Sequence, residues 1–354
     1  MRLFKCQVCQ QIVYFENTIC ERCSHKLGYL PHAVTLSALE PEGDVWRALA
    51  APEKTWRYCA NAVHGACNWL VDAGSTETLC LSCRHNRTIP DLGVPDYLNG
   101  WRKIETAKHR LFYSLVRLDL PLATRTENET VGLVFDVLAD PPGEPRVMTG
   151  HDNGLITLAL IEADDAHRER NRVQLHEPYR TLLGHFRHEI GHYFWDRLVD
   201  DGGRLDDFRA LFGDDRQDYG QALQQHYSNG PPQNWQESFV SAYASTHPWE
   251  DFAETWAHYL HIVDTLEIAG SFGMSTRPAL TRGDELDSDV HFDPYRAAGI
   301  GQLVDSWMPL SVALNSLNRA MGQSDLYPFV LSAPMIDKLG FVHSLVQPAP
   351  TAVR

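Results

Sequence analysis

The 354-residue sequence predicts an α+β protein, with an N-terminal cysteine module followed by a larger, mostly helical domain that contains a small sheet. Three observations support this prediction. All eight cysteines lie between Cys6 and Cys83. Two short apolar runs bounded by turn residues follow the cysteines, and the remainder of the chain is dominated by segments with helical periodicity. The proline- and glycine-containing segment 89–100 separates the two parts, which predicts domains at residues 1–95 and 96–354.

Each element is predicted from its apolar pattern. Residues 96–118 place Trp101, Ile104 and Leu111 among other apolar side chains at helical spacing, which indicates an amphipathic helix. Runs 131–138 and 154–160 are apolar and rich in β-formers, so we expect strands there. Further helices are predicted at 178–199, 249–266, 301–321 and 335–346. The first of these begins with a proline and ends before a pair of glycines, as helices often do.

The composition argues against several classes of protein. Hydrophobic residues make up 44% of the chain and charged residues 22%, as in ordinary globular proteins. The 31 basic and 46 acidic residues give a net charge of −15, which disfavours nucleic-acid and anionic-membrane partners. No apolar run approaches the roughly 20 residues that a membrane span needs. No apolar signal core precedes the first cysteines, so we expect a cytoplasmic protein.

The cysteines are arranged as metal ligands rather than as a disulfide framework. The first four form two C-x2-C pairs, and two such turns can close a four-sulfur zinc site. The last four are more loosely spaced, and His64 lies in their first gap as an alternative ligand. We predict a double zinc ribbon with two structural zinc ions, grouped sequentially or, alternatively, interleaved. The predicted ligands are Cys6, Cys9, Cys20 and Cys23, followed by Cys59, Cys67, Cys80 and Cys83.

The helix predicted at 178–199 carries the sequence His188-Glu189-Ile190-Gly191-His192. Residues four apart lie on one helical face, so both histidines can bind a single zinc ion. Glu189 lies next to that ion without ligating it, where it can accept a proton from a water molecule. Phe186 and Ile190 form part of an apolar back face, which favours a helix packed into the protein over two exposed histidines.

A catalytic zinc ion needs a third protein ligand, and the helix predicted at 249–266 offers one. Glu250, Glu254 and His258 form a stripe at i, i+4 and i+8 on one helical face. With Glu250 as the ligand, Glu254 lies one turn away and can hold a ligating histidine by its other ring nitrogen. His258 and Asp251 remain alternative ligands at this stage.

The whole chain resembles the bacterial family of zinc-binding metallopeptidases that carry an N-terminal zinc-ribbon domain. The resemblance rests on the C-x2-C pairs, on residues 187–196, on the Glu-Asp-Phe-Ala-Glu run at 250–254 and on residues 325–331. The core is more distantly similar to the gluzincins, in which a later glutamate is the third zinc ligand. The resemblance thus implies a zincin-like domain in which one catalytic zinc is held by His188, His192 and Glu250.

Toxin proteases of the lethal-factor type share a Glu-x-Phe-Ala-Glu run, preceded by a tyrosine that faces the developing oxyanion. Tyr243 occupies the corresponding position, seven residues before Glu250. A phenol donor beside the metal is also chemically suited to stabilise a tetrahedral oxyanion, although Tyr243 is equally compatible with a core position. The similarity to the toxins is confined to the two site helices and implies nothing about the substrate.

These features predict a zinc-dependent peptidase with a peptide or protein substrate, in which Glu189 activates the attacking water. The alternative is a non-catalytic binding or scaffold protein with a relic zincin core. For the peptidase, we expect residues Gly154, Leu155, Ile156 and Thr157 to lie on an edge strand that pairs with an extended substrate.

Overall fold

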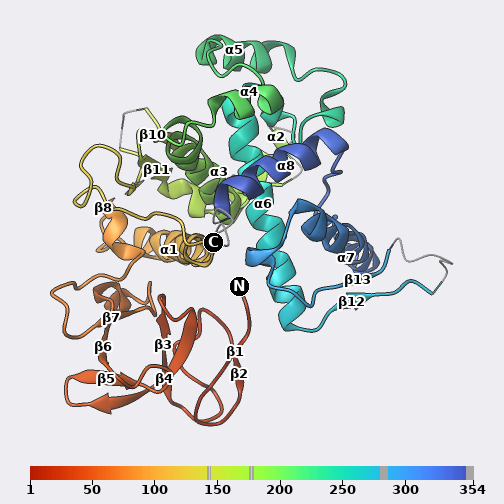
Figure 1. The fold of residues 1–354 in the computed structure, drawn as a ribbon. Coiled ribbons are helices and arrows are strands. Elements are labelled where there is room, and N and C mark those ends of the chain that lie inside the picture. Colours follow the sequence, from red (N-terminus) through yellow and green to blue (C-terminus); the bar gives the residue numbers. More distant parts are fainter. Residues whose placement is uncertain (142, 144, 175–176, 178, 280–285, 348–354) are drawn as a thin grey trace, which may run out of the picture. The chain divides into compact units, whose positions relative to one another are not determined.

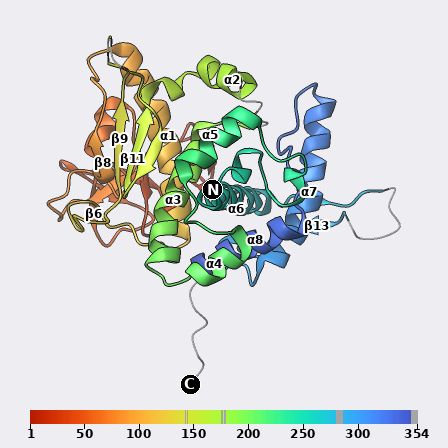
Figure 2. The same ribbon diagram turned by 90° about the horizontal axis from the view of Figure 1, so that it is seen from above.

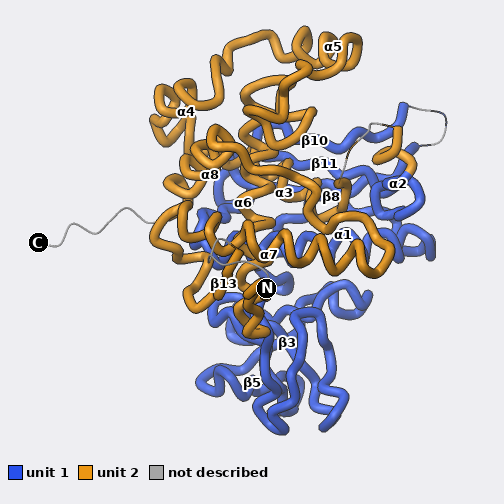
Figure 3. Tube along the Cα trace, turned by 90° about the vertical axis from the view of Figure 1, so that its right-hand side faces the viewer, with its two compact units in different colours: residues 1–169 blue, residues 170–354 orange. Residues whose placement is uncertain are grey.

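The computed structural model describes residues 1–354 except 142, 144, 175–176, 178, 280–285 and 348–354. The fold is α+β, as the sequence predicts, and it divides into two compact units at residues 1–169 and 170–354 (Figures 1 and 3). Helix α2 (Asp165–Gln174) crosses the division. None of the helices in the described part of the chain is both long enough and apolar enough to cross a bilayer.

The first part of unit 1 is a set of short antiparallel strands. Strands β1 (Phe4–Lys5) and β2 (Ile12–Val13) pair with each other. A five-stranded sheet follows in the order β3 (Lys26–Leu30), β4 (Thr35–Glu42), β5 (Val45–Ala48), β6 (Thr55–Tyr58) and β7 (Leu70–Asp72). One hydrophobic cluster of this sheet consists of Leu30, Leu39, Ala48, Ala51 and Leu70, with Trp46, Trp56 and Tyr58 packed against it. Phe15, Tyr29 and Trp69 are also buried and pack on one another, and small modules of this kind commonly gain further stability from structural metals.

The second part of unit 1 combines helix α1 (Pro95–Arg117) with a mixed sheet. The helix begins with proline at its first turn, and Trp101, Ile104 and Leu111 on its apolar face are fully buried. The sheet has the order β10 (Gly150–Asp152), β11 (Leu155–Ala159), β9 (Val134–Leu138), β8 (Asn86–Thr88). Because β8 comes before α1 in the chain and pairs with β9, the sheet joins segments on both sides of the 95/96 boundary.

The edge position that the sequence predicts for residues 154–157 is wrong. Strand β11 pairs antiparallel with β10 on one side and parallel with β9 on the other. Residues 155–157 are therefore paired with a neighbouring strand on both sides, which leaves no free strand edge there for a peptide. The outer position belongs to β10, a three-residue strand that is too short to give an apolar pattern in the sequence.

Unit 2 is built around one long helix, α6 (Pro248–Ser271), which contacts α3, α7 and α8 (Figure 2). Its other elements are α3 (Leu182–Phe194), a π-helical turn (Trp195–Asp200), α4 (Leu205–Phe212), α5 (Tyr219–Asn229), β12 (Ser275–Thr276), β13 (Ser288–Asp289), α7 (Ile300–Ala320) and α8 (Ala333–Val346). Short 3-10 turns include Tyr243–Ser245 before α6. Phe208, Phe252 and Trp256 belong to an aromatic core between α4 and α6.

Helix α3 begins later than the sequence predicts. Thr181 is its N-cap, and the Thr181 hydroxyl accepts a hydrogen bond from the Gly184 N–H at 3.0 Å. Pro178, which we expected at the helix start, lies outside the described residues. The helical path continues beyond Phe194 as the π turn, so the predicted end near residue 199 agrees with the end of the whole helical segment.

Helices α3 and α6 approach each other closely at Gly191. A Cβ atom added to Gly191 would lie 2.9 Å from Ala253 Cα and 3.2 Å from Trp256 Cβ. A side chain of any size would therefore push the two helices apart, and glycine at this position sets their separation. The stacking of Phe194 on Trp256, with ring centroids 5.0 Å apart, continues the same contact.

We expect Gly191→Ala to lower the free energy of unfolding by about 1–3 kcal/mol, because the added methyl group overpacks the contact between α3 and α6. Chemical denaturation of the full chain measures the change. Gly301→Ala in α7 is the matched control, since nothing lies within 4 Å of its added Cβ. Equal stability changes in the two variants would contradict this account of Gly191.

Candidate metal centre

Helix α3 presents His188 and His192 on the same face, one turn apart. Their Nε2 atoms lie 3.2 Å from each other. The opposite face carries Phe186 and Ile190, both fully buried, which anchor the helix and fix its rotation. The two imidazoles are therefore held toward one point by a helix that is packed from behind.

Glu250 reaches the same point from the first turn of α6. His247, the residue just before α6, caps the helix: its side chain accepts a hydrogen bond from the Trp249 N–H. Glu250 is 2% exposed, and its Oε2 atom lies 3.0 Å from His188 Nε2 and 3.5 Å from His192 Nε2. We refer to His188, His192 and Glu250 as the His–Glu centre.

The His–Glu centre fits a zinc ion. Tetrahedral zinc with ligand bonds of about 2.0–2.1 Å separates neighbouring nitrogen and oxygen ligands by about 3.3 Å. The three separations observed here are 3.0, 3.2 and 3.5 Å. Two imidazoles and one carboxylate are also the ligand set of zinc sites that keep an open fourth position.

A second layer of hydrogen bonds orients the ligands. His188 Nδ1 donates to Glu254 Oε1 at 2.7 Å, which leaves the lone pair of Nε2 directed at the centre. Burial by itself raises the pKa of Glu254, but the bond from His188 outweighs it and brings that pKa down to about 2. Glu254 Oε2 accepts from the Ser241 hydroxyl at 2.7 Å, and Glu250 Oε1 accepts from the Tyr219 hydroxyl at 2.6 Å.

Tyr219 and Ser241 are functional residues that the sequence motifs do not indicate. Tyr219 is the first residue of α5, 31 positions before Glu250, and Ser241 lies 13 positions before Glu254. Neither residue stands at a spacing that links it to the motifs. The only local signal is Asp218, which marks the start of α5 by capping the Gln221 N–H.

Glu189 and Tyr243 lie beside the centre. Glu189 follows His188 on α3, and burial raises the pKa of its carboxyl. The Tyr243 ring lies 5.9 Å from the His188 ring, measured between centroids. Burial raises the pKa of Tyr243 as well, so its phenol keeps the proton and stays a hydrogen-bond donor.

The alternative third ligands are engaged elsewhere. His258 Nδ1 lies 2.7 Å from the Tyr327 hydroxyl, and burial lowers the pKa of His258 to about 4. Asp251 accepts from Lys338 Nζ at 2.6 Å in a buried ion pair. Of the three candidates, Glu250 is the one that the structure brings to the histidines.

The cysteines form two further groups, both within unit 1. Cys6, Cys9, Cys20 and Cys23 make the first cysteine centre, and Cys59, Cys67, Cys80 and Cys83 make the second cysteine centre. Sulfur separations of 3.6 Å (Cys6–Cys23), 3.5 Å (Cys9–Cys20) and 3.7 Å (Cys67–Cys80) are close to the roughly 3.8 Å expected around tetrahedral zinc. The grouping is sequential. The His64 ring instead contacts Trp101, with centroids 5.9 Å apart.

Comparison with known protein families agrees with this geometry. Residues 97–345 match the family described as "putative zinc-binding metallo-peptidase", and residues 3–94 match a zinc-ribbon domain. The chain belongs to this metallopeptidase family. The cysteine groups of unit 1 fit the zinc ribbon, and zinc binding is a property of the family.

Relatives of this chain occur in mycobacteria. An uncharacterized protein of Mycobacterium bovis and two uncharacterized proteins from strains of Mycobacterium tuberculosis are each 42% identical to it over 347 residues. The match covers 98% of this chain and 95% of each relative, so the ribbon and the helical region occur together in all of them. No solved structure matches the chain.

We expect Glu250→Ala to reduce zinc at the His–Glu centre strongly, because two histidines alone leave the ion under-coordinated. Glu254→Ala is the matched variant on the same helix. It should weaken zinc binding only about 10–100-fold, since Glu254 contacts the ligand and not the ion. Zinc content after identical dialysis of both variants measures the difference. The reverse order would mean that Glu254 is the ligand.

Proposed function

We propose that this chain is a zinc-dependent peptidase of the gluzincin type that hydrolyses peptide bonds in a peptide or protein substrate. The observation that supports it most directly is the arrangement of His188, His192 and Glu250, whose ligand atoms lie 3.0–3.5 Å apart with Glu189 next to them in sequence. We further propose three zinc ions for each chain, one at the His–Glu centre and one at each cysteine centre.

His188, His192 and Glu250 would hold a zinc ion, which would supply polarisation of a substrate carbonyl and easier deprotonation of water. The protein supplies the remaining functions. Glu189 accepts the proton of the attacking water and returns it to the leaving amine. The Tyr243 phenol donates a hydrogen bond to the oxyanion that develops on the carbonyl oxygen. Glu254 and Tyr219 hold His188 and Glu250 in place through the hydrogen bonds described above.

We also propose that the protein works in the cytoplasm. The eight cysteines form no disulfide bonds and gather in two groups that could each hold a metal ion. Metal binding by these groups requires reduced thiols. Cytoplasmic conditions keep such thiols reduced, whereas an oxidising compartment favours disulfides.

We expect Glu189→Gln to retain zinc and to lose turnover by roughly 10²-fold or more, because glutamine cannot accept a proton. Cleavage of a peptide library, read by mass spectrometry, measures the activity, and zinc content is determined on the same sample. Activity close to wild type would exclude Glu189 as the base. A wild-type protein that holds zinc at the His–Glu centre and cleaves no substrate would instead support the scaffold alternative.

Metal removal should separate the two kinds of site. Closed four-sulfur sites release zinc more slowly than a three-ligand site with an open position, so a mild chelator should abolish cleavage before it unfolds unit 1. Activity and circular dichroism followed along one chelator titration test this. Loss of both signals in a single step would contradict the assignment of open and closed sites.

A further inference from the structure

The second cysteine centre receives a fifth candidate donor from helix α1. The Nε2 atom of His109 lies 3.3 Å from Cys67 Sγ, 3.7 Å from Cys83 Sγ and 3.9 Å from Cys80 Sγ. His109 is 5% exposed, so this ring is enclosed together with the thiols. We propose that His109 is a zinc donor of the second cysteine centre, able to take the fourth coordination position in place of Cys59. This inference does not depend on peptidase activity.

The hydrogen bond at the other ring nitrogen prepares His109 for this role. His109 Nδ1 lies 2.6 Å from the backbone carbonyl oxygen of Glu105, one turn earlier on α1. A carbonyl oxygen only accepts, so Nδ1 carries the hydrogen. In the neutral ring, Nε2 then has its lone pair directed at the three sulfurs. Histidines that bind metals in proteins almost always donate their other N–H in this way.

The distances agree with coordination of one ion by three sulfurs and one nitrogen. With Zn–S bonds of about 2.3 Å and Zn–N bonds of about 2.0–2.1 Å, tetrahedral geometry separates nitrogen from sulfur by about 3.6 Å. The three observed separations, 3.3, 3.7 and 3.9 Å, bracket this value. One nitrogen close to three sulfurs at once occupies the position of a fourth vertex.

The contacts also show which thiol His109 can replace. Its Nε2 atom neighbours Cys67, Cys80 and Cys83, but no comparable contact links it to Cys59 within the described part of the chain. A tetrahedral site needs four donors that all neighbour one another. His109 therefore completes a site with the other three thiols when Cys59 is absent, and it cannot do so when Cys67 is absent.

Glu105 is a second candidate donor near these thiols, with its Oε2 atom 3.6 Å from Cys83 Sγ. Its Oε1 atom accepts from Lys108 Nζ at 2.6 Å and from Asn86 Nδ2 at 3.0 Å. This carboxylate is thus already paired with a buried ammonium group. Zinc surrounded by thiolates also takes an imidazole nitrogen in many known sites, which favours His109 over Glu105 as the donor.

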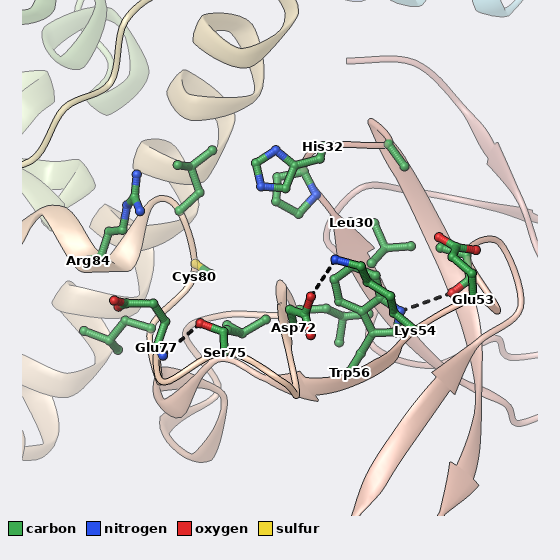
Figure 4. Close-up of a pocket in the computed structure, with 17 residues that line it drawn as sticks. Leu30, His32, Glu53, Lys54, Trp56, Asp72, Ser75, Glu77, Cys80 and Arg84 are labelled. Atoms are coloured by element: carbon green, nitrogen blue, oxygen red, sulfur yellow. Dashed lines mark hydrogen bonds and ion pairs between the residues drawn. The ribbon is translucent and has the colours of Figure 1, made fainter.

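Two pockets approach the second cysteine centre and offer a route for the ion. One, of about 590 Å³, is lined by Cys80 together with Leu30, Trp56 and Arg84 (Figure 4). The other, of about 490 Å³, is lined by both Cys67 and His109. An entry path is one of the requirements for a functional metal site, and here it reaches the proposed donor itself.

Cobalt substitution in the full-length protein tests the proposal. Cys59→Ser should keep the metal of the second cysteine centre, with Co²⁺ bands that indicate three sulfurs and one nitrogen. Cys67→Ser should lose this metal. Cys59→Ser combined with His109→Ala should also lose it, so the metal content falls by one ion for each chain relative to Cys59→Ser. His85→Ala in the Cys59→Ser background is the matched control, because His85 is an equally buried histidine that contacts the Leu133 carbonyl.

Each outcome decides the question. The proposal is supported if the metal is retained in Cys59→Ser and in the double variant Cys59→Ser, His85→Ala, but lost in the double variant Cys59→Ser, His109→Ala. This comparison holds even if the variants are less stable than the wild type. Loss of the metal in Cys59→Ser to the same extent as in Cys67→Ser overturns it. Retention after removal of both Cys59 and His109 overturns it as well, and would point to Glu105 or water as the fourth ligand.

Discussion

The close contact between α3 and α6 is the constraint on which the site in unit 2 depends. The histidines lie on one helix and Glu250 on the other, so their separation is set by how near the two backbones come. Gly191 allows that approach because it has no side chain at the point where Ala253 faces it. The same two helices then supply the supporting bond from His188 to Glu254. The contact between α3 and α6 thus positions both the three ligands and the hydrogen bond that orients His188.

Unit 1 relies on a different source of stability. Two four-cysteine centres lie in it beside small hydrophobic groups, and metal bound there would contribute directly to its folding free energy. Helix α1 adds a substantial apolar face, yet it also buries Glu105, Lys108 and His109 next to the second cysteine centre. Burying these polar groups costs free energy unless they are paired. Their pairing with one another and with the thiols offsets that cost and ties the helix to the ribbon.

The two family matches meet near residue 95, whereas the compact units divide at residues 169 and 170. The difference arises because α1 and strands β9 to β11 belong by sequence to the metallopeptidase region but pack in unit 1, with β8 completing their sheet. The boundary between the matched families and the boundary between the compact units therefore lie at different places in the chain. The match to the relatives covers 95% of their length and therefore includes both regions.

The sequence by itself determined what depends on local spacing. The i, i+4 placement of His188 and His192 follows from helical geometry alone, and the paired cysteines identify ligand-bearing turns without reference to the rest of the fold. Helices α3, α6, α7 and α8 agree with the predicted ranges to within about five residues for the same reason, since their apolar periodicity is local, whereas α4 and α5 are not predicted.

Only the tertiary structure decided the features that require two segments to meet. It brought Glu250, and neither Asp251 nor His258, to the two histidines, because the rotation of α6 is fixed by its packing and not by its own pattern. It brought Tyr219, Ser241 and His109 to their centres across separations of 13 to 42 residues. It also placed β11 inside its sheet, because strand order depends on which strands pair and cannot be obtained from the composition of any single strand.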